Sequence, residues 1–417
     1  MIQQTGFPAP ARAVPVLAWR RAAFAMFAVG WGANHFTALL PIYRRALGLP
    51  DTALTAIFGV YLFGLAPGLL LGGPLSDRYG RRPVLLMSVG LSLAGSLTLI
   101  AGTPGAVGAT ALYAGRLLTG VAAGGTFAAG SAWVKELSAR TAEGTGARRA
   151  AISLSAGFGA GPLAAGLLAQ WASAPTILPY LAHLALAAAA LALLPGAPET
   201  VTLSPVSESV LARLRVPSAG APRFRRVVAP MAPWVFGSAT ISFAVLPARA
   251  AGRLDGLSVA FTGVVAALTL ATGILAQPLA RRIGHNDPAR GATAGLGAVA
   301  LGCAIGALAA VTGSPALVLA AAVVLGGGYG LCLVSGLREV ERLAGPDDLA
   351  GLVAVYYVLA YCGFAAPYLL ALLAPALGYP AGLLLTAGLA VATLAGVATQ
   401  ARRLAPLADA RERRPNS

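Results

Sequence analysis

Apolar residues along this chain gather into long runs separated by short charged or Pro/Gly-rich segments. Each run has roughly the 20 residues that a helix needs to cross the hydrocarbon core of a bilayer. The runs lie at Arg20–Ile42, Thr52–Leu75, Val84–Ala101, Val107–Val134, Ala147–Trp171, Thr176–Leu194, Val227–Ala248, Leu257–Ala280, Gly291–Val311, Ala316–Leu337, Leu349–Leu373 and Tyr379–Thr399. This pattern predicts an all-α integral membrane protein with twelve transmembrane helices.

The longest interruption of the apolar pattern divides the runs into two groups of six. We expect an N-terminal half at residues 1–194, a cytoplasmic linker at 195–226 and a C-terminal half at 227–417, which ends in a basic cytoplasmic tail. The halves resemble each other, because "GGPLSDRYGRR" after the second run compares with "AQPLARRIGHN" after the eighth. Internal repeats are typical of transporters that bind their substrate between the repeats, near the middle of the membrane.

Composition and charge support a membrane protein. Hydrophobic residues make up 57% of the 417 residues and charged residues 11%, which leaves too little polar surface for a water-soluble chain of this length. The net charge of +16 lies in short arginine clusters without a continuous basic stripe, which argues against binding to nucleic acid. Most clusters fall in alternate connections, so both termini are expected in the cytoplasm of a plasma (inner) membrane protein. Heavy use of Ala, Gly, Pro and Arg favours a bacterial source.

The sequence contains no pattern for catalysis or for a cofactor. Its three cysteines lie within apolar runs and are not spaced as a disulfide framework or a metal site. It lacks a glycine-rich phosphate loop that ends in Lys-Ser/Thr, and its three histidines are scattered without a nearby acid. We therefore expect no enzyme, no cofactor and no metal. The expected partners are a small-molecule substrate, protons and the bilayer, and the expected state is a monomer.

Gly72 to Leu86 reads "GGPLSDRYGRRPVLL" and concentrates charge between the second and third runs. A positive-inside anchor explains its arginines but does not explain Asp77 or the glycines around it. Gly73 is expected to admit a neighbouring helix, and Gly80 to support a tight turn in a cytoplasmic loop. Asp77 can accept hydrogen bonds from an arginine or from a helix N-terminus. We interpret the segment as a latch that holds the cytoplasmic face closed.

This segment resembles the loop-two signature of the major facilitator superfamily, and the resemblance extends through the linker and the repeated second half to nearly the whole chain. The matching positions are Gly73, Leu75, Asp77, Arg78, Gly80, Arg81 and Arg82. In that family the aspartate contacts the start of helix eleven, and a basic motif residue pairs with an acid that ends helix four, which is Glu136 here. The second copy has Arg281 in place of the aspartate and Gln277 in place of the glycine. The resemblance therefore implies a complete latch in the N-terminal half alone.

The fourth run contains "GRLLTGVAAGG", which is similar to a helix-four motif of the same family built on an intramembrane arginine. Arg116, Gly120 and Gly124 recur every four residues and so share one helix face. The glycines favour close packing against another helix. Arg116 lies too deep for its side chain to reach the surface easily, which points to a functional role.

The fifth run contains "SLSAGFGAGPLAAG", which resembles a helix-five motif associated with proton-coupled exporters of drugs and metabolites. The matching positions are Gly157, Gly161, Pro162 and Gly166, with Ala165 in place of one glycine. Helix packing alone also explains such small residues. The resemblance is the main ground for expecting export over import.

Asn34 and His35 lie within the first run, and His183 is a similar but weaker candidate in the sixth. Polar residues inside a membrane are either packed and hydrogen-bonded or functional. We hypothesise that Arg116 faces a central cavity and alternates between Asn34, His35 and the substrate. No carboxylate lies deep in any run, so the proton would need another carrier than an intramembrane acid.

These expectations combine into a secondary active transporter that works by alternating access and exports a drug or metabolite in exchange for protons. A proton-coupled importer of a small metabolite is the alternative in the same class. A non-transporting receptor or a membrane enzyme is the alternative in another class, and the short linker and the absence of a catalytic cluster argue against both.

Overall fold

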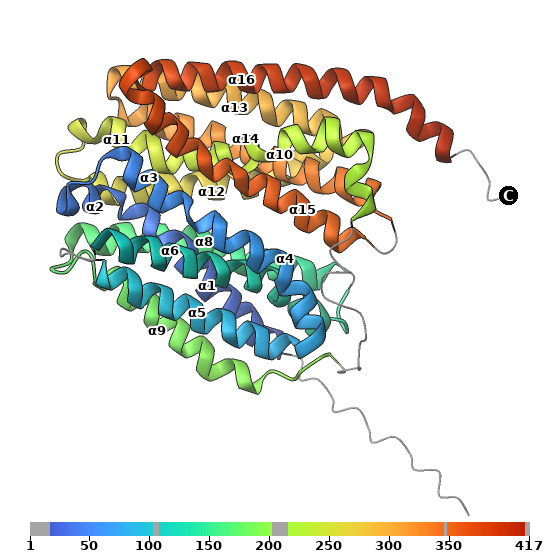
Figure 1. Cartoon of the computed structure of the whole chain (residues 1–417), viewed down its shortest axis with the longest axis horizontal. Helices are drawn as coiled ribbons and strands as arrows, with labels where there is room; N and C mark the ends of the chain where they lie inside the picture. The colour runs from blue at the N-terminus through green and yellow to red at the C-terminus, as the bar shows by residue number, and fades with distance from the viewer. Residues whose placement is uncertain (1–16, 103–107, 143, 202–215, 346–347, 413–417) are drawn as a thin grey trace, which may run out of the picture.

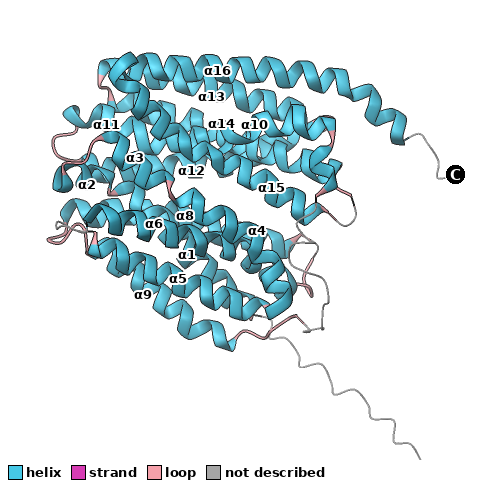
Figure 2. Ribbon diagram, in the orientation of Figure 1, coloured by secondary structure: helices cyan, strands magenta, loops and turns pink. Residues whose placement is uncertain are grey.

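The computed structural model describes residues 17–102, 108–142, 144–201, 216–345 and 348–412. Within these ranges it consists of helices and connecting turns, with no strand, as Figure 2 shows. This confirms the all-α prediction. Long stretches of apolar sequence form helices because a backbone in lipid must satisfy its own hydrogen bonds.

The described residues up to 201 form the lower group of helices in Figure 1, drawn in blue to green. In chain order these are α1 (Trp19–Ala38), α2 (Leu40–Leu47), α3 (Asp51–Gly59), α4 (Tyr61–Tyr79), α5 (Arg81–Ala101), α6 (Gly108–Gly125), α7 (Ser131–Leu137), α8 (Thr145–Trp171) and α9 (Leu178–Leu193). A five-residue π-helical segment, Thr126–Gly130, joins α6 to α7, so the two cross the membrane as one unit.

The described residues from 216 onward form the upper group in Figure 1, drawn in yellow to red. These are α10 (Ala229–Thr240), α11 (Leu246–Ala250), α12 (Ser258–Ile283), α13 (Pro288–Thr312), α14 (Pro315–Leu343), α15 (Leu349–Tyr361) and α16 (Ala366–Glu412). We call the two sets the first and second groups. The predicted domain boundaries at residues 194 and 226 stay a prediction.

Ten helices of the described chain are long and apolar enough to cross a membrane, and the bent pair α1–α2 makes eleven. One of the ten, Leu349–Leu404, has 56 residues, which at 1.5 Å per residue is far longer than a bilayer core of about 30 Å. Gly378 interrupts α16 with φ 73° and ψ 157°, and Figure 1 shows the chain turning back there. One crossing on each side of Gly378 would bring the count to twelve, and the count of twelve spans stays a prediction.

The first predicted run, Arg20–Ile42, is not one straight helix. α1 ends at Ala38 and meets α2 at an angle of 49°. Pro41 lies in the first turn of α2, where its missing N–H costs no hydrogen bond and where it cannot continue α1. The bend turns the short helix α2 out of the direction of α1.

Small residues bring the helices of the first group into close contact. A Cβ atom on Gly120 or Gly124 would lie 2.2 Å from the Tyr61 carbonyl oxygen or 2.4 Å from that of Leu65, both on α4. Likewise, a Cβ atom on Gly157 would lie 2.2 Å from the Phe27 carbonyl oxygen on α1. Because lipid provides no hydrophobic force between helices, such backbone approach is a main source of packing energy.

The helix-five segment also joins the two groups. Gly161 packs on Trp31 of α1, whereas a Cβ atom on Gly166 would lie 3.1 Å from Gly263 Cα on α12. A Cβ atom on Gly263 would in turn lie 2.6 Å from the carbonyl oxygen of Pro162. The predicted small-residue positions of α8 therefore face α1 on one side and α12 of the second group on the other.

Candidate functional site

Charged and polar side chains gather at the two ends of the molecule. We call the end at which α4 ends and α5 begins the linker face, at the right of Figure 1, and the end that carries α2 and α11 the opposite face, at the left. Aromatic side chains fill the space between the two groups midway between these faces.

The predicted cytoplasmic loop between the second and third spans is a single residue. α4 continues through Asp77 and Arg78 to Tyr79, and α5 begins at Arg81. Gly80, which separates them, has φ 100° and ψ 155°, a backbone conformation that residues with a Cβ atom rarely adopt. The charged motif therefore sits on two rigid helix ends, so its side chains are held in fixed directions.

Arg81 is the centre of the charged cluster on this face. Its guanidinium donates to Asp77 Oδ1 at 2.5 Å, to Glu136 Oε1 at 2.8 Å and to Ser76 Oγ at 2.6 Å. Glu136 lies near the end of α7, so Arg81 joins three helices. We call Arg81, Asp77 and Glu136 the first cluster. A contact of Asp77 with the start of the eleventh span stays a prediction, although α15 does pack against α4.

Residues 195–201, which we call the linker strap, bind to this cluster. Glu199 accepts hydrogen bonds from the backbone N–H groups of Arg81 at 3.0 Å and Arg82 at 2.9 Å, the first residues of α5. Thr200 Oγ1 donates to Glu136, and Trp133 Nε1 donates to the Pro198 carbonyl at 3.1 Å. The strap therefore satisfies N–H groups that the start of a helix leaves without partners.

The environment of Glu199 favours its ionised form. Partial burial acts to raise the pKa of this carboxyl group, but backbone N–H donors at Arg82, Val201, Arg81 and Thr200 outweigh it and leave the pKa below its ordinary value. A carboxylate at a helix N-terminus also interacts favourably with the helix dipole. The sequence interpretation missed Glu199, because nothing in a Pro-rich connection shows which distant helix it will cap.

Three motif residues have surroundings that differ from the centre of the cluster. The Arg78 side chain is exposed and lies over the Tyr79 ring, and Leu75 is partly buried. The expectation that Gly73 admits a neighbouring helix is wrong, because a Cβ atom there would meet nothing within 4 Å. Gly72 makes this approach instead, and a Cβ atom on it would lie 3.0 Å from Gly125 Cα on α6. One residue along a helix turns the side chain by about 100°, which separates the two faces.

The second group contains a comparable cluster that the sequence interpretation missed. Arg223, just before α10, donates to Glu339 near the end of α14 at 2.7 Å and to Asp287 at 3.0 Å. Asp287 also caps α13 by accepting from the Ala289 N–H. We call Arg223, Asp287 and Glu339 the second cluster. Its two acids were visible in the sequence, but their arginine comes from the linker rather than from the repeated motif.

At the opposite face, one carboxylate ties the two groups together. Asp51, at the start of α3, contacts Arg44 at 2.6 Å, and it accepts hydrogen bonds from Arg249 at 3.0 Å and from the Tyr379 hydroxyl at 2.7 Å. Arg249 and Tyr379 belong to the second group, and the Arg249 guanidinium lies 3.9 Å from the centre of the Tyr379 ring. We call this the opposite-face contact, and it must break for the groups to separate there.

Between the two faces, aromatic rings of both groups stack on each other. The rings of Phe58 and Phe364 are 5.1 Å apart and parallel within 5°, and those of Tyr61 and Phe364 are 5.5 Å apart. The space left between them is a cavity of about 20 Å³, enough for about one water molecule. Its lining residues come from both groups and are Asn34, Tyr61, Phe158, Phe236, Ala239, Phe243, Leu270, Tyr329, Tyr361 and Phe364. The described structure is thus closed at its centre.

Arg116 does not face this cavity, which contradicts the hypothesis drawn from the sequence. Its side chain is fully buried, and it donates to the Ala33 carbonyl at 2.9 Å and to the Phe58 carbonyl at 3.2 Å. The guanidinium also lies 4.6 Å from the centre of the Tyr61 ring, an attractive cation–π arrangement. Backbone carbonyls and ring faces replace the carboxylate that the sequence does not supply.

Asn34 and His35 point in different directions from α1. Asn34 lines the aromatic cavity, whereas His35 is fully buried and packs against Tyr180 and His183 of α9. The three residues Asn34, His35 and Arg116 therefore do not form one site. The structure instead brings His35 together with His183, the histidine that the sequence favoured less.

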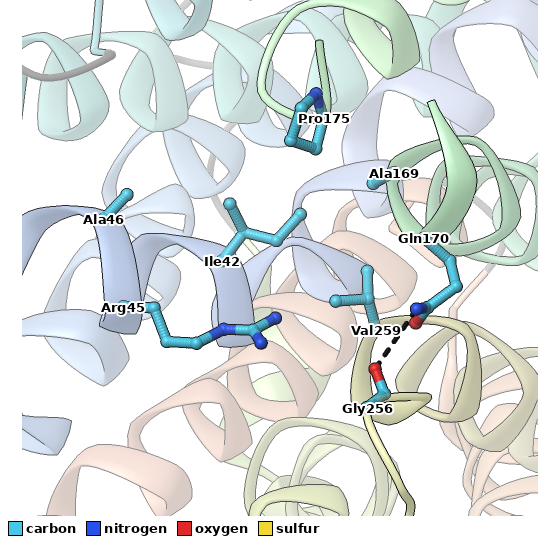
Figure 3. A pocket seen from close by; sticks show the side chains of 8 residues that line it. All are labelled: Ile42, Arg45, Ala46, Ala169, Gln170, Pro175, Gly256 and Val259. Atoms are coloured by element: carbon cyan, nitrogen blue, oxygen red, sulfur yellow. Dashed lines mark hydrogen bonds between the residues drawn. The ribbon is translucent and has the colours of Figure 1, made fainter. Parts of the chain in front are cut away.

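A second cavity, of about 420 Å³, lies at the opposite face between the two groups (Figure 3). Gln170 of α8 spans one side of it, donating to the Gly256 carbonyl at 3.1 Å and accepting from the Ala260 N–H. The Arg45 side chain extends along another side in the figure. In the part of the chain that the structure describes, no group of three or more His, Cys, Asp or Glu residues is placed to hold a metal.

Comparison with known proteins places these observations in a family. The sequence profile of the Major Facilitator Superfamily matches residues 22–248. Multidrug resistance protein MdtL from Salmonella schwarzengrund (strain CVM19633) is 30% identical over 96 residues. This match covers 23% of this chain and 23% of MdtL, so the chain spans less than a quarter of that relative's length.

Solved structures match over a much larger share of the chain. A POT family transporter in complex with 5-aminolevulinic acid has a TM-score of 0.72 at 16% identity, covering 97% of this chain and 99% of that one. The nucleoside transporter NupG has a TM-score of 0.67 at 15% identity, covering 92% and 98%. At these identities the likeness establishes the fold.

Membrane-spanning helices in two groups that meet around a central aromatic cavity define a multi-pass transporter fold. Since the family profile covers more than half of its length, the chain belongs to the Major Facilitator Superfamily.

Proposed function

We propose that this protein is a secondary active transporter that exports a drug or metabolite in exchange for protons by alternating access. The observation that carries the proposal is the arrangement of contacts between the two groups. Asp51 ties them at the opposite face, and aromatic rings of both groups close the centre. To open the cavity to the opposite face, the Asp51 contacts must break while the two groups rotate about the close contact between α8 and α12.

Two features support export over import. The helix-five segment with Gly157, Gly161, Pro162 and Gly166 resembles that of exporters, and the curated relative that shares 96 residues is named a multidrug resistance protein. In this proposal the first cluster acts as the latch on the linker face. The protein has no catalytic activity of its own and works as a monomer.

The arginine distribution supports the orientation. In the proposed arrangement the linker face and both termini lie in the cytoplasm and the opposite face lies outside, in the inner membrane of a bacterium. Cysteines introduced at Ser314 should then react with impermeant thiol reagents in intact cells, and cysteines at Ser138 should not. The reverse pattern would overturn this orientation.

The aromatic lining suggests the first probe for a transport test. Ring faces attract apolar molecules and cations, so ethidium, a planar aromatic cation, suits the chemistry of this cavity. In proteoliposomes with an acidic interior, we expect the purified protein to accumulate ethidium inside, because protons leave as ethidium enters. Accumulation toward the alkaline side would indicate the importer alternative, and movement that ignores the pH gradient would contradict proton coupling. A thermal-shift screen of antibiotics, sugars and amino acids extends the probe set.

A further inference from the structure

Two histidines from distant parts of the chain meet inside the first group of helices. His35 of α1 and His183 of α9 have ring centres 5.2 Å apart, and both side chains are fully buried. Gly32 makes this possible, because a Cβ atom there would lie 2.4 Å from His183 Nε2. With polar side chains costly inside a membrane, such a pair is an unusual choice for packing alone.

His183 has hydrogen-bond partners for either protonation state. Its Nδ1 lies 2.8 Å from Ser96 Oγ and its Nε2 lies 3.3 Å from Ser92 Oγ, both on α5. A serine hydroxyl donates or accepts according to its rotation, so the neutral ring can donate to one serine and accept from the other. The protonated ring can donate to both. Taking up a proton at His183 therefore breaks no hydrogen bond.

His35 is not satisfied in this way. Among the described residues neither Nδ1 nor Nε2 of His35 has a hydrogen-bond partner, although the ring is fully buried. An unsatisfied buried polar group lowers the stability of the fold, and a residue with a purely structural role gives no reason for this loss. The His35 ring lies roughly perpendicular to the rings of Tyr180 and His183, with centres 4.7 and 5.2 Å away, so a second imidazole stands beside His183.

The titratable groups that face the pair come from α9 itself and from two further helices, α2 and α6. Tyr180 lies one turn from His183 on α9, and its hydroxyl is 2.6 Å from that of Tyr43 on α2. Arg116 of α6 interacts electrostatically with His35. The pair lies close to the opposite face, since His183 is in the second turn of α9 and His35 is in the last turn of α1. Tyr43 and Tyr180 thus cover it on that side.

We propose that the His35–His183 pair is the proton-binding site of this transporter, and that α2 controls its access from the opposite face. This rests on the proposed function, whose direction and coupling it specifies. Arg44 on α2 contacts Asp51, so breaking the opposite-face contact frees α2 and withdraws Tyr43 from Tyr180. Water then delivers a proton to an imidazole nitrogen, and the N–H bond breaks again, with return of the proton to water, when the cavity opens to the linker face.

The added charge reaches the substrate cavity through Arg116. A protonated pair repels this guanidinium, which is already buried without a carboxylate among its contacts in the described structure. The guanidinium lies against Tyr61, and Tyr61 lines the central cavity. Protonation at the pair and occupancy of the cavity therefore oppose each other, as an exchanger requires.

The first test needs no substrate. The chain has three histidines, so the full-length protein labelled on histidine gives few side-chain NMR signals to follow against pH. Asp51→Asn weakens the opposite-face contact. In this variant we expect the His35 and His183 signals to titrate together between about pH 5 and 8. Arg249→Gln opens the same contact from its other side, should Asp51→Asn fold poorly. If neither histidine signal titrates in either of these two variants, the proposal is wrong.

Two further variants separate a pair from two independent rings. His35→Gln should raise the titration midpoint of His183, since one like charge is removed, and Ser96→Ala should lower it, since the protonated ring loses an acceptor. The exposed His285 is the matched control, and its own midpoint should stay the same in each variant. An unchanged His183 midpoint in His35→Gln would show that no pair exists.

The second test uses ethidium in proteoliposomes. For one proton per ethidium, the wild type should accumulate the dye about tenfold per unit of pH gradient, because one pH unit is tenfold in proton activity. His183→Gln should exchange ethidium across the membrane but not accumulate it, and His285→Gln should behave as wild type. Accumulation by His183→Gln at the wild-type level, or loss of exchange together with accumulation, would overturn the proton assignment. A wild type that ignores the gradient contradicts the proposed function instead, and the titration still decides the pair.

Discussion

The first and second clusters on the linker face share a layout and differ in how it is built. In each, one arginine lies between an acid near the end of a membrane helix and a second acid on a neighbouring element. The arginine of the first cluster comes from the motif itself, at the start of α5. That of the second is Arg223, which precedes the π-helical segment Phe224–Val228 that leads into α10, although the repeated motif supplies arginines of its own at residues 281 and 282.

This difference shows which property the two halves share. Glu136 and Glu339 occupy corresponding places near the ends of α7 and α14, and each needs a cation when a helix end places it near the membrane. The position of the guanidinium is shared, whereas its place in the sequence is not. The clusters also differ in burial, because the Glu136 side chain is 34% exposed and that of Glu339 is 1% exposed.

The largest effect is expected in the buried second cluster. Arg223→Ala leaves the Glu339 carboxylate buried without its cation, and losing one partner of a buried pair costs about 3–5 kcal/mol. We expect a clear fall in thermal unfolding temperature and in yield from the membrane. Arg290→Ala, an exposed arginine on α13, is the control. Equal melting of both variants would mean that the second cluster does not stabilise its group.

The first cluster should affect transport more than stability. Asp77→Asn keeps the shape of a side chain that is 42% exposed, so its salt bridge to Arg81 contributes at most about 1 kcal/mol to folding. We expect normal yield and melting but strongly reduced ethidium transport, because the latch loses its charge. The exposed counterpart variant Arg281→Ala should transport normally. Wild-type transport by Asp77→Asn would reduce the motif to a charged anchor.

A smaller and pH-dependent effect is expected at the linker strap, whose acid, Glu199, binds the start of α5 in the first group. Glu199→Gln weakens the cap on α5, a change worth about 1 kcal/mol for a helix N-cap. The pKa of Glu199 is lowered in the folded state, so its contribution is complete above its ordinary value of 4.5 and is lost as the pH falls through the folded pKa. Melting curves of wild type and variant should differ at pH 7 and converge once the pH falls below the folded pKa of Glu199. A constant difference would rule out the carboxylate as the cause.

The smallest effect concerns the glycine that the second copy of the motif lacks. Gly73→Ala places a Cβ atom in open space inside a helix, so stability should rise by about 0.5–1 kcal/mol and transport should persist. Gln277 at the matching position of the second half fits this expectation. Gly72→Ala, next to Gly125, is the control that should lower melting. Loss of transport in Gly73→Ala would show that Gly73 acts in another state of the cycle.

Much of the fold follows from the sequence because membrane helices have a strong local signal. Apolar runs of sufficient length mark the spans, and a glycine between two charged helix ends marks the turn at Gly80. The interruption at Gly378 falls in the predicted break between Leu373 and Tyr379, whereas the bend after Ala38 was harder to foresee, since Gly and Pro are common within membrane helices. Their effect depends on neighbouring helices.

Site residues were harder to predict wherever their role depends on distant contacts. Arg116 has the depth expected of a functional group, but the nearby carbonyls of Ala33 and Phe58 hold it away from the cavity. His183 was only the weaker histidine candidate, because its contact with His35 depends on the packing of α9 beside α1 and α5. Glu339 and Glu199 lie in stretches that also contain other charged residues, and no local pattern shows which arginine or helix end they bind.

The strap contact of Glu199 has a consequence for the order of biosynthesis. The amide of Arg81 and the carboxylate that receives its hydrogen bond are 118 residues apart, and α5 to α9 lie between them. A ribosome therefore delivers the start of α5 to the membrane long before its cap exists. The linker face of the first group reaches its final form after the sixth span has been inserted, which makes Glu199 a late marker of correct assembly, detectable by protease protection in translation products truncated before and after residue 199.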